Sequence, residues 1–454
     1  MTTLTEHASQ AVGGLPRLLP PPGGPGGPGA GQGRLAGLAA HLARHGRPGY
    51  RDHPGALLGD IGAAGLTGRG GAAFPVQRKL RAVLDAAAGR RHTPVVVGNA
   101  AESEPASAKD ATLLWLSPHL VLDGLQLAAE AVGADRAVLA LHAGPVLDGP
   151  TAGGPGHALA GRLREALAAR QAAGTDRVPV TLAPIPAAFL AGQETALLSH
   201  LAGGPAIPAF TPARVTERGL GGAPTLVQNV ETLAHLALIA RHGPRWFRTA
   251  GTPDEPGSML ATVHRADRPP LITEVPLGIP LGELVGGLKP DDAVLVGGYH
   301  GTWLTGWQAR GLTLDNRSLA AAGARAGAGV VAVLPASRCG LAETARVARY
   351  LALESAGQCG PCLNGLPRIA AALAEIAGRR GRPELVADLA RWSGLVTGRG
   401  ACHHPDGTAR FVASALRAFA ADLDQHQRGR CLASDARPFL PVPTAAGHRP
   451  TEWS

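Results

Sequence analysis

Apolar runs of strand length alternate with helix-length stretches over residues 60–240, and this alternation constrains the fold more than any other feature of the chain. Three apolar runs, at 94–97, 137–141 and 178–182, have the length and composition of buried strands. Between the first two, Ser117 precedes a proline, the cap and first-turn pair that begins a helix. Strand–helix–strand order favours parallel pairing with right-handed crossovers, so we predict an α/β domain.

The flanking segments differ in composition from this core. The start of the chain is rich in proline and glycine and lacks hydrophobic periodicity, which is typical of disorder. Short strands near 259–263, 271–275 and 293–296 indicate a separate small α+β module, and helical periodicity begins near Gly340. We therefore expect five segments: a disordered N-terminus over 1–35, the α/β domain over 36–245, the module over 246–330, a helical bundle over 331–428 and an irregular tail over 429–454.

Composition excludes several classes of function. The net charge is +9, but the arginines are scattered and no aromatic residues interleave with them, so we expect no nucleic-acid binding. Five cysteines in 454 residues are sparse and odd in number, which argues against a secreted disulfide framework. The chain shows neither a signal-peptide pattern nor an apolar run long enough to span a bilayer. We expect a cytoplasmic protein without direct membrane insertion.

A glycine-rich segment between Gly65 and Pro75 runs into a helix that we expect over residues 76–87. Glycines allow close approach of the backbone to a ligand, and a helix start favours an anion. Lys79 lies one turn into this helix and is one of three lysines in a chain that otherwise uses arginine. A purely structural turn is the alternative, because the whole chain is rich in glycine.

Polar residues follow the first predicted strand. Asn99, Glu102 and Glu104 come just after it, where the carboxyl end of a strand in an α/β sheet binds ligands. Solvated loop residues are the alternative interpretation of this cluster.

Four segments together carry a family resemblance. They are G-L-T-G-R-G-G-A-A-F-P-V-Q-R-K from Gly65, N-A-A-E-S-E-P-A-S-A-K-D from Asn99, G-Q-E-T-A-L from Gly192 and P-T-L-V-Q-N-V-E-T-L from Pro224. In order and spacing the chain resembles, from about residue 60 to 425, the FMN- and NADH-binding F subunit of respiratory complex I. The same family includes chains of NAD-linked hydrogenases and formate dehydrogenases.

The resemblance implies a Rossmann-like FMN-binding domain, a β-grasp module of the soluble-ligand-binding (SLBB) type and a helical iron–sulfur domain. It implies hydride transfer from NAD(P)H to FMN, then single-electron transfer to a 4Fe-4S cluster and a partner. The implied partner is a 2Fe-2S subunit or another iron–sulfur carrier, in a complex that is peripheral to the membrane. The implied FMN contacts are Gly68, Arg69, Gly70, Lys79, Asn99, Glu102, Gln228, Asn229 and Thr232. Phe74, Glu104 and Glu194 would lie near the nicotinamide, with the two glutamates in catalytic positions.

The cysteines point to a metal site. Cys359 and Cys362 form a C-G-P-C segment, which on its own fits a thioredoxin-type pair, a zinc site or an iron–sulfur site. The helical pattern before Cys359 disfavours the thioredoxin interpretation. Cys402, about forty residues later, makes a third ligand where the family carries its distal cysteine. The resemblance implies a 4Fe-4S cluster on these three cysteines.

The family's first cysteine of this motif is replaced by Ala356. Four thiolates normally hold such a cluster, so the fourth position falls to water, Ser355 or an imidazole such as that of His403. A three-iron cluster, an absent cluster and zinc remain alternatives. Cys339 and Cys431 lie outside the motif, and we interpret them as a buried thiol and a tail thiol.

Other departures affect the dinucleotide site. Ala101 and Gln193 replace acidic residues of the family motifs, and Ala82 and Arg214 stand where relatives place aromatic rings. Lost aromatic stacking would weaken dinucleotide binding by about tenfold or more, and lost negative charge would suit NADPH. These departures also motivate a second hypothesis: a docking or assembly subunit that oxidises NADH inefficiently.

Overall fold

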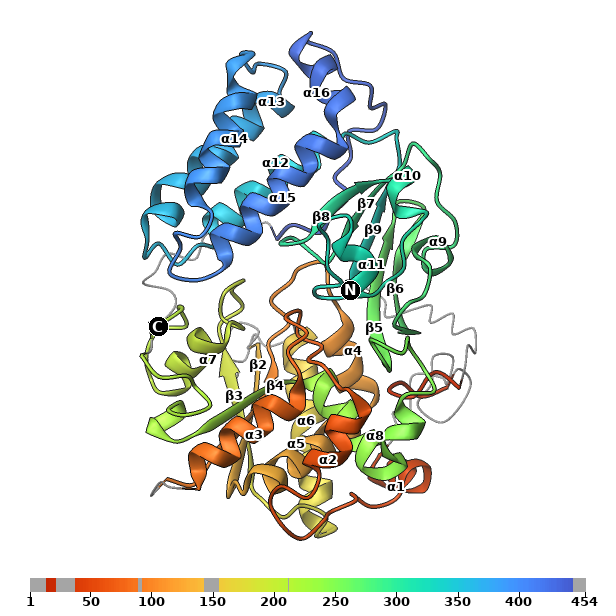
Figure 1. The fold of residues 1–454 in the computed structure, drawn as a ribbon, viewed down its shortest axis with the longest axis vertical. Coiled ribbons are helices and arrows are strands. Elements are labelled where there is room, and N and C mark those ends of the chain that lie inside the picture. Colours follow the sequence, from red (N-terminus) through yellow and green to blue (C-terminus); the bar gives the residue numbers. More distant parts are fainter. Residues whose placement is uncertain (1–13, 22–36, 89–91, 143–154, 211, 444–454) are drawn as a thin grey trace.

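The computed structural model describes residues 14–21, 37–88, 92–142, 155–210 and 212–443. Figure 1 shows three parts. An α/β domain lies at the bottom of the view, a second sheet at the upper right and a group of helices at the top.

The α/β domain is built on a four-stranded parallel sheet in the order β3-β2-β1-β4. Its strands are β1 (Val95–Ala100), β2 (Arg136–His142), β3 (Val180–Ile185) and β4 (Thr225–Asn229). The central strand β1 pairs on both sides, with Val97 opposite Val138 and Val227. The first three strands confirm the alternation found in the sequence. The fourth, inside the P-T-L-V-Q-N segment, is not among the predicted strands.

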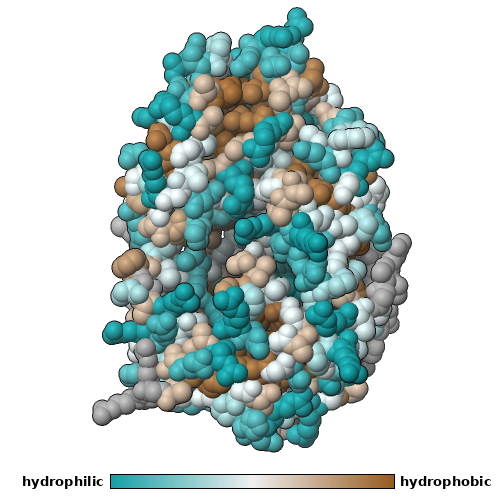
Figure 2. All heavy atoms as spheres, in the orientation of Figure 1, coloured by the Kyte–Doolittle hydropathy of each residue, from teal (hydrophilic) through white to brown (hydrophobic). Residues whose placement is uncertain are grey.

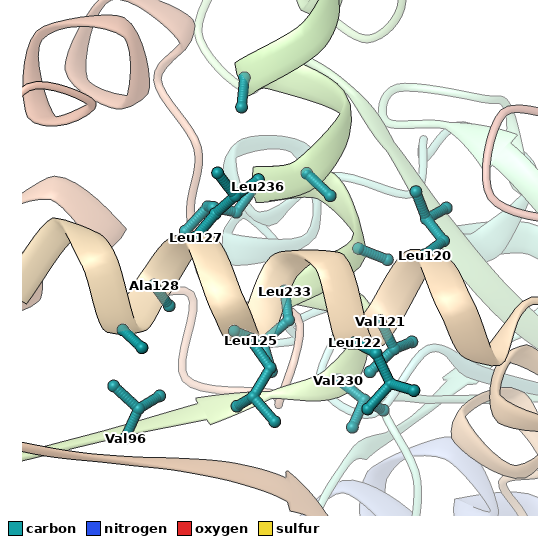
Figure 3. Packing of buried hydrophobic residues seen from close by; sticks show 14 of the residues in the cluster. Val96, Leu120, Val121, Leu122, Leu125, Leu127, Ala128, Val230, Leu233 and Leu236 are labelled. Carbon is teal, nitrogen blue, oxygen red and sulfur yellow. The ribbon is translucent and has the colours of Figure 1, made fainter. Parts of the chain in front are cut away.

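The helices of this domain cover both faces of the sheet. They are α1 (Leu38–His45), α2 (Leu58–Ala64), α3 (Val76–Ala87), α4 (Lys109–Leu116), α5 (Pro118–Val132), α6 (Pro155–Ala172), α7 (Glu194–Leu201) and α8 (Val230–Phe247). Val96 faces the core formed with α5 and α8, where Leu125 and Leu233 are fully buried (Figure 3). Val97 faces the opposite core, which includes Leu197 of α7.

The contact between α5 and α8 depends on one glycine. A Cβ at Gly124 would lie 1.9 Å from the carbonyl oxygen of Leu233. Any side chain there would force the two helices apart. Since closely packed interiors tolerate little added volume, we infer that glycine is required at this crossing.

The second sheet is mixed, in the order β6-β5-β9-β7-β8. Its elements are β5 (Ser258–Arg265), β6 (Arg268–Pro276), α9 (Leu281–Leu284), β7 (Ala293–Val296), β8 (Thr302–Thr305), α10 (Gly306–Ala309), α11 (Asn316–Ala320) and β9 (Val330–Leu334). Two antiparallel hairpins flank β9, which pairs in parallel with β5. This is the expected β-grasp arrangement. Because β9 belongs to the sheet, the module extends past the expected boundary at residue 330.

The C-terminal part is helical, as expected. It contains α12 (Gly340–Leu353), a π-helical turn (Pro361–Gly365), α13 (Leu366–Ala377), α14 (Glu384–Val396), α15 (His404–Ala418) and α16 (Ala420–Gln427). Apolar side chains gather over these helices at the top of the view in Figure 2. In the part of the chain that the structure describes, no helix combines the length and apolar character needed to cross a membrane.

One N-terminal expectation needs correction. Residues 14–21 lie within the segment whose composition predicts disorder, yet Leu18 is fully buried in the core of the α/β domain. Arg17 donates to the carbonyl oxygen of Phe247, and its backbone N–H bonds Glu274 at 2.7 Å. A few apolar side chains in a Pro/Gly-rich segment suffice to dock it, and composition averaged over 35 residues hides them.

Candidate functional site

A cavity of about 460 Å³ lies where the three parts of the protein meet. Its size is typical of a small-molecule or cofactor site. The α/β domain contributes the carboxyl edge of its sheet, the β-grasp module contributes Gly297 and His300, and the helical part contributes Arg410. Six of the residues predicted from the sequence line it: Arg69, Gly70, Asn99, Glu102, Glu104 and Asn229.

The glycine-rich loop forms one wall of the cavity. It closes on itself through a bond from the Gly68 N–H to the Phe74 carbonyl oxygen at 2.9 Å. Gly71 has φ +101°, a left-handed conformation that favours glycine, and a Cβ added there would lie 3.6 Å from the backbone of Gly327 in the β-grasp module. At Gly70 and Gly71 the wall is bare backbone, so a ligand can approach the main chain closely.

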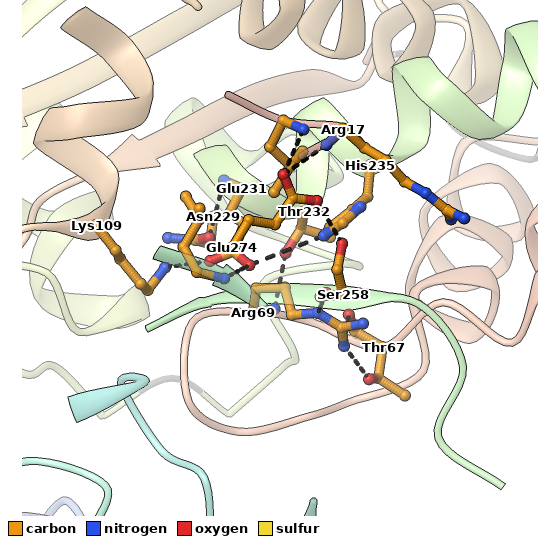
Figure 4. Close-up of polar contacts among 12 residues, drawn as sticks. Arg17, Thr67, Arg69, Lys109, Asn229, Glu231, Thr232, His235, Ser258 and Glu274 are labelled. Carbon is orange, nitrogen blue, oxygen red and sulfur yellow. Dashed lines mark hydrogen bonds and ion pairs between the residues drawn. The ribbon is translucent and has the colours of Figure 1, made fainter. Parts of the chain in front are cut away.

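The Arg69 guanidinium is turned toward protein carbonyls (Figure 4). Its Nε donates to the Ser258 carbonyl oxygen at 3.1 Å and its Nη1 to the Thr67 hydroxyl at 2.7 Å. Its backbone N–H donates to the Thr232 hydroxyl at 2.9 Å. Burial lowers the pKa of this guanidinium. Arg69 and Thr232 therefore join the loop to α8 and β5, and we assign them this positioning role beside the cavity.

A buried ion-pair group supports the floor of the cavity. Lys109 Nζ lies 2.7 Å from Asp110 Oδ1 and 2.8 Å from Glu231 Oε2, and all three side chains are buried. Burial alone would raise the pKa of Glu231, but Lys109 lowers it to about 2. For Asp110, burial outweighs Lys109 and raises the pKa to about 6. Sequence reasoning missed this group, although Lys109 is one of the three lysines in the sequence.

Side-chain amides gather at the ends of β1 and β4. Asn99 Nδ2 donates to the Gly192 carbonyl oxygen at 2.8 Å, and Asn229 Nδ2 donates to Asp110 Oδ2 at 2.7 Å. Gln228 is buried, and its Nε2 has no hydrogen-bond partner among the described residues. Buried amide donors are normally paired. The amides of Asn99 and Asn229, the bare backbone of the loop and the cavity volume together fit a polar heteroaromatic cofactor such as FMN.

The two glutamates after β1 have different environments. Glu102 accepts bonds from the backbone N–H groups of Asp110 and Ala111, both at 3.0 Å, at the start of α4. Glu104 accepts from the Tyr299 N–H at 2.7 Å, and burial raises its pKa to about 7. Glu104 can therefore gain or lose a proton near neutral pH. Glu102 instead caps the start of α4 and lines the cavity.

Lys79 and Glu194 form an ion pair between α3 and α7, with Nζ and Oε1 2.5 Å apart. Gln193, where the family motif has a glutamate, caps α7 by accepting from the backbone N–H groups of Thr195 and Ala196. An amide oxygen therefore preserves the capping bonds that this position makes. Phe74 is 48% exposed and lies near Arg78, outside the cavity lining. Five further predicted residues also lie outside that lining: Gly68, Lys79, Glu194, Gln228 and Thr232.

In the helical part, Cys359 and Cys402 are both close enough to Cys362 to act on it electrostatically. Burial raises the pKa of the Cys362 thiol, and the neighbouring Cys359 and Cys402 raise it further, while Ser355 acts in the opposite direction by hydrogen bonding. Three soft thiols with a hydroxyl beside them fit an iron–sulfur cluster. Ala356 is buried in the core shared with α7.

The imidazole of His403, which the sequence suggested as a fourth cluster ligand, faces solvent. His403 is fully exposed and faces Asp406, 3.3 Å away. The adjacent His404 is buried, and its Nε2 donates to the Leu351 carbonyl oxygen at 2.8 Å. His404 Nδ1 therefore accepts from His300 Nε2 at 3.0 Å. This pair of neutral imidazoles joins the cavity to the helical part, and sequence reasoning did not anticipate it.

A glycine-walled cavity at the carboxyl edge of a parallel sheet, beside a three-cysteine helical part, is the arrangement of a flavin- and iron–sulfur-dependent oxidoreductase. Two family models match: the Nuo51 FMN-binding domain over residues 61–238, and the NADH-ubiquinone oxidoreductase-F iron–sulfur binding region over residues 342–426. The F subunit of the NADH-quinone oxidoreductase of Streptomyces coelicolor is 30% identical over 413 residues, 88% of each chain. The chain belongs to this family of NADH-quinone oxidoreductase F subunits, an electron-transfer module of the NADH dehydrogenase class.

Other proteins of related function are similar to this chain to the same degree. The second of the NADH-quinone oxidoreductase F subunits of Rhizobium meliloti is 30% identical over 395 residues, covering 83% of this chain and 90% of the relative. The air-oxidised crystal structure of an NAD+-reducing nickel–iron hydrogenase matches with a TM-score of 0.72 at 30% identity. That match covers 86% of this chain but only 65% of the hydrogenase chain.

Proposed function

We propose that this cavity is where hydride passes from NADH to FMN, and that electrons leave through the cysteines of the helical part. The observation that carries this proposal is the meeting of the glycine-rich wall, the amides of Asn99 and Asn229 and the His300 imidazole in one cavity. When bound, FMN accepts an electron pair and releases electrons singly, and a 4Fe-4S cluster carries single electrons.

Different residues would bind different parts of FMN, each according to its chemical group. Backbone at Gly70 and Gly71 admits the cofactor closely, while the amides of Asn99 and Asn229, which line the cavity, offer donors and acceptors for a ring edge. The Lys79 ammonium supplies positive charge for a phosphate. In this structure the Glu194 carboxylate pairs with that ammonium. When a phosphate binds, it would replace Glu194 as the ion-pair partner of Lys79.

Glu104 is the proposed proton-holding group beside the nicotinamide, because its pKa of about 7 lets it hold or release a proton at working pH. Glu194 positions Lys79, and Phe74 offers an exposed ring at the end of the loop. Arg214 is exposed and does not line the cavity, whereas Ala101, where the family motif has a carboxylate, does line it. We favour NADH as the donor because the relatives are NADH-quinone oxidoreductase subunits.

Cys359, Cys362 and Cys402 are the proposed protein ligands of the cluster, with the Ser355 hydroxyl as the fourth. Ser355 is favoured over His403 because its hydroxyl is near enough to Cys362 to lower the pKa of that thiol, whereas the His403 side chain is fully exposed. The proposed partners are a 2Fe-2S subunit or a similar iron–sulfur carrier. Such a partner would hold the chain at the periphery of a membrane-associated complex.

The proposal is tested on protein purified without oxygen. Flavin and iron content are measured first, and the bleaching of bound flavin is then followed after NADH or NADPH is added. Rapid bleaching by NADH is expected, and electron paramagnetic resonance of the reduced sample should show a 4Fe-4S signal. Bound flavin that neither dinucleotide reduces would refute the enzymatic role and leave the docking-subunit hypothesis.

A further inference from the structure

A second group of metal-ligating side chains lies apart from the three cysteines already described. Cys339, His426 and Cys431 each present one ligand atom, and these atoms all lie within 4.8 Å of one another. His426 lies on α16 and is buried, Cys339 caps the start of α12, and Cys431 lies in the tail just after α16. We propose that these three residues bind a zinc ion.

The spacing of the ligand atoms fits zinc. A tetrahedral ion with a Zn–S bond of about 2.3 Å and a Zn–N bond of about 2.0–2.1 Å places sulfur and nitrogen about 3.6 Å apart. Cys339 Sγ and His426 Nε2 are 3.5 Å apart. Two thiols and one imidazole are also the ligand types that zinc prefers.

The imidazole of His426 is oriented as a ligand. Its Nδ1 lies 3.0 Å from the carbonyl oxygen of Ile376, and a carbonyl only accepts, so Nδ1 carries the proton. In the neutral ring Nε2 then holds a lone pair, and that lone pair faces Cys339. Metal-binding histidines characteristically fix their tautomer with such a bond from the second ring nitrogen.

The sulfur of Cys339 accepts the Ala342 N–H at 3.4 Å at the start of α12. This bond favours a thiolate, but burial raises the pKa of the thiol, so the bound metal itself would have to displace the proton. On binding, zinc would displace the thiol protons of Cys339 and Cys431 to solvent and take the Nε2 lone pair of His426. Water completes the tetrahedron, since three protein ligands leave one position open.

Such an ion would fasten the tail to the body of the protein. Beyond Cys431, the backbone N–H groups of Phe439 and Leu440 bond Glu343 of α12, both at 3.0 Å. Farther on, the Tyr299 hydroxyl donates to the Pro441 carbonyl oxygen at 2.6 Å. The Tyr299 N–H bonds Glu104, so the tail supports the loop that holds a cavity residue.

The test separates zinc from iron in the full chain. Protein is produced with both metals supplied and purified without oxygen, and each metal is counted by mass spectrometry. Cys431→Ser should lose the zinc and keep the iron, whereas Cys402→Ser should lose iron and keep zinc. His426→Gln should lose zinc as Cys431→Ser does. Cobalt in place of zinc should give the strong visible bands of a tetrahedral thiolate site, and Cys431→Ser should abolish them.

Other outcomes would overturn the proposal. They are a wild-type chain that takes up no zinc beyond that lost with Cys402→Ser, zinc retained by Cys431→Ser, and a native disulfide between Cys339 and Cys431. Hydrogen exchange adds a readout independent of electron transfer: removal of zinc should speed exchange in residues 431–443 of wild type and leave Cys431→Ser unchanged.

Discussion

Replacing Lys109 by methionine should destabilise the protein strongly. Methionine keeps the apolar stem but removes the charge, which leaves the carboxylates of Asp110 and Glu231 buried without their shared partner. Breaking a buried ion pair in this way costs about 3–5 kcal/mol. That is a large part of the roughly 5–15 kcal/mol by which folded proteins are usually stable.

The assay is urea unfolding followed by circular dichroism. With a slope of about 3 kcal/mol per molar urea, the midpoint should fall by about 1–2 M. Lys289→Met is the matched control, because Lys289 is exposed and its loss should change stability by less than about 0.5 kcal/mol.

A second variant separates charge from packing. In Lys109→Met/Glu231→Gln, the Glu231 carboxylate, which has lost its partner Lys109, becomes a neutral amide. The oxygen of that amide can still accept the Leu260 N–H, which Glu231 Oε1 accepts at 2.8 Å in the wild type. The double variant should therefore be more stable than Lys109→Met. Equal midpoints for Lys109→Met and Lys289→Met would refute the reasoning.

Three further predictions concern the site. Lys79→Met should weaken FMN binding by about 10- to 100-fold, the loss of one charge-assisted bond, whereas Glu194→Gln should not weaken it; titration of flavin fluorescence decides. Burial raises the pKa of Glu104 from 4.5, its value in the unfolded chain, to about 7 in the folded protein. Protonated Glu104 therefore stabilises the fold fully below pH 4.5, and this stabilisation is lost as the pH rises through 7. The melting temperature of wild type should thus fall relative to that of Glu104→Gln over this window, and parallel curves would contradict this. Ala356→Cys should slow loss of iron in air by adding a fourth thiolate, whereas the control Ala370→Cys should not; equal iron loss in both would count against the ligand set.

Local patterns account for much of the fold. The strands β1 and β2 follow from apolar runs, and the helix α3 begins directly after Pro75 at the end of the glycine-rich segment; both signals act over a few neighbouring positions. Short strands without such runs are harder to predict, and β4 lies in a polar motif. The docked segment at 14–21 escapes prediction because its few leucines are hidden in a Pro/Gly-rich stretch.

The sequence by itself determined which chemical groups the protein has and in what order they occur: a glycine-rich loop, strand-end amides and three cysteines at family spacing. Tertiary structure decided which of them meet. It turned Arg69 toward backbone carbonyls, paired Lys79 with Glu194, and brought Cys339 to His426 across 87 positions of the chain. The reason is physical, because contacts between distant residues depend on how whole helices and sheets pack, and no local pattern encodes that packing.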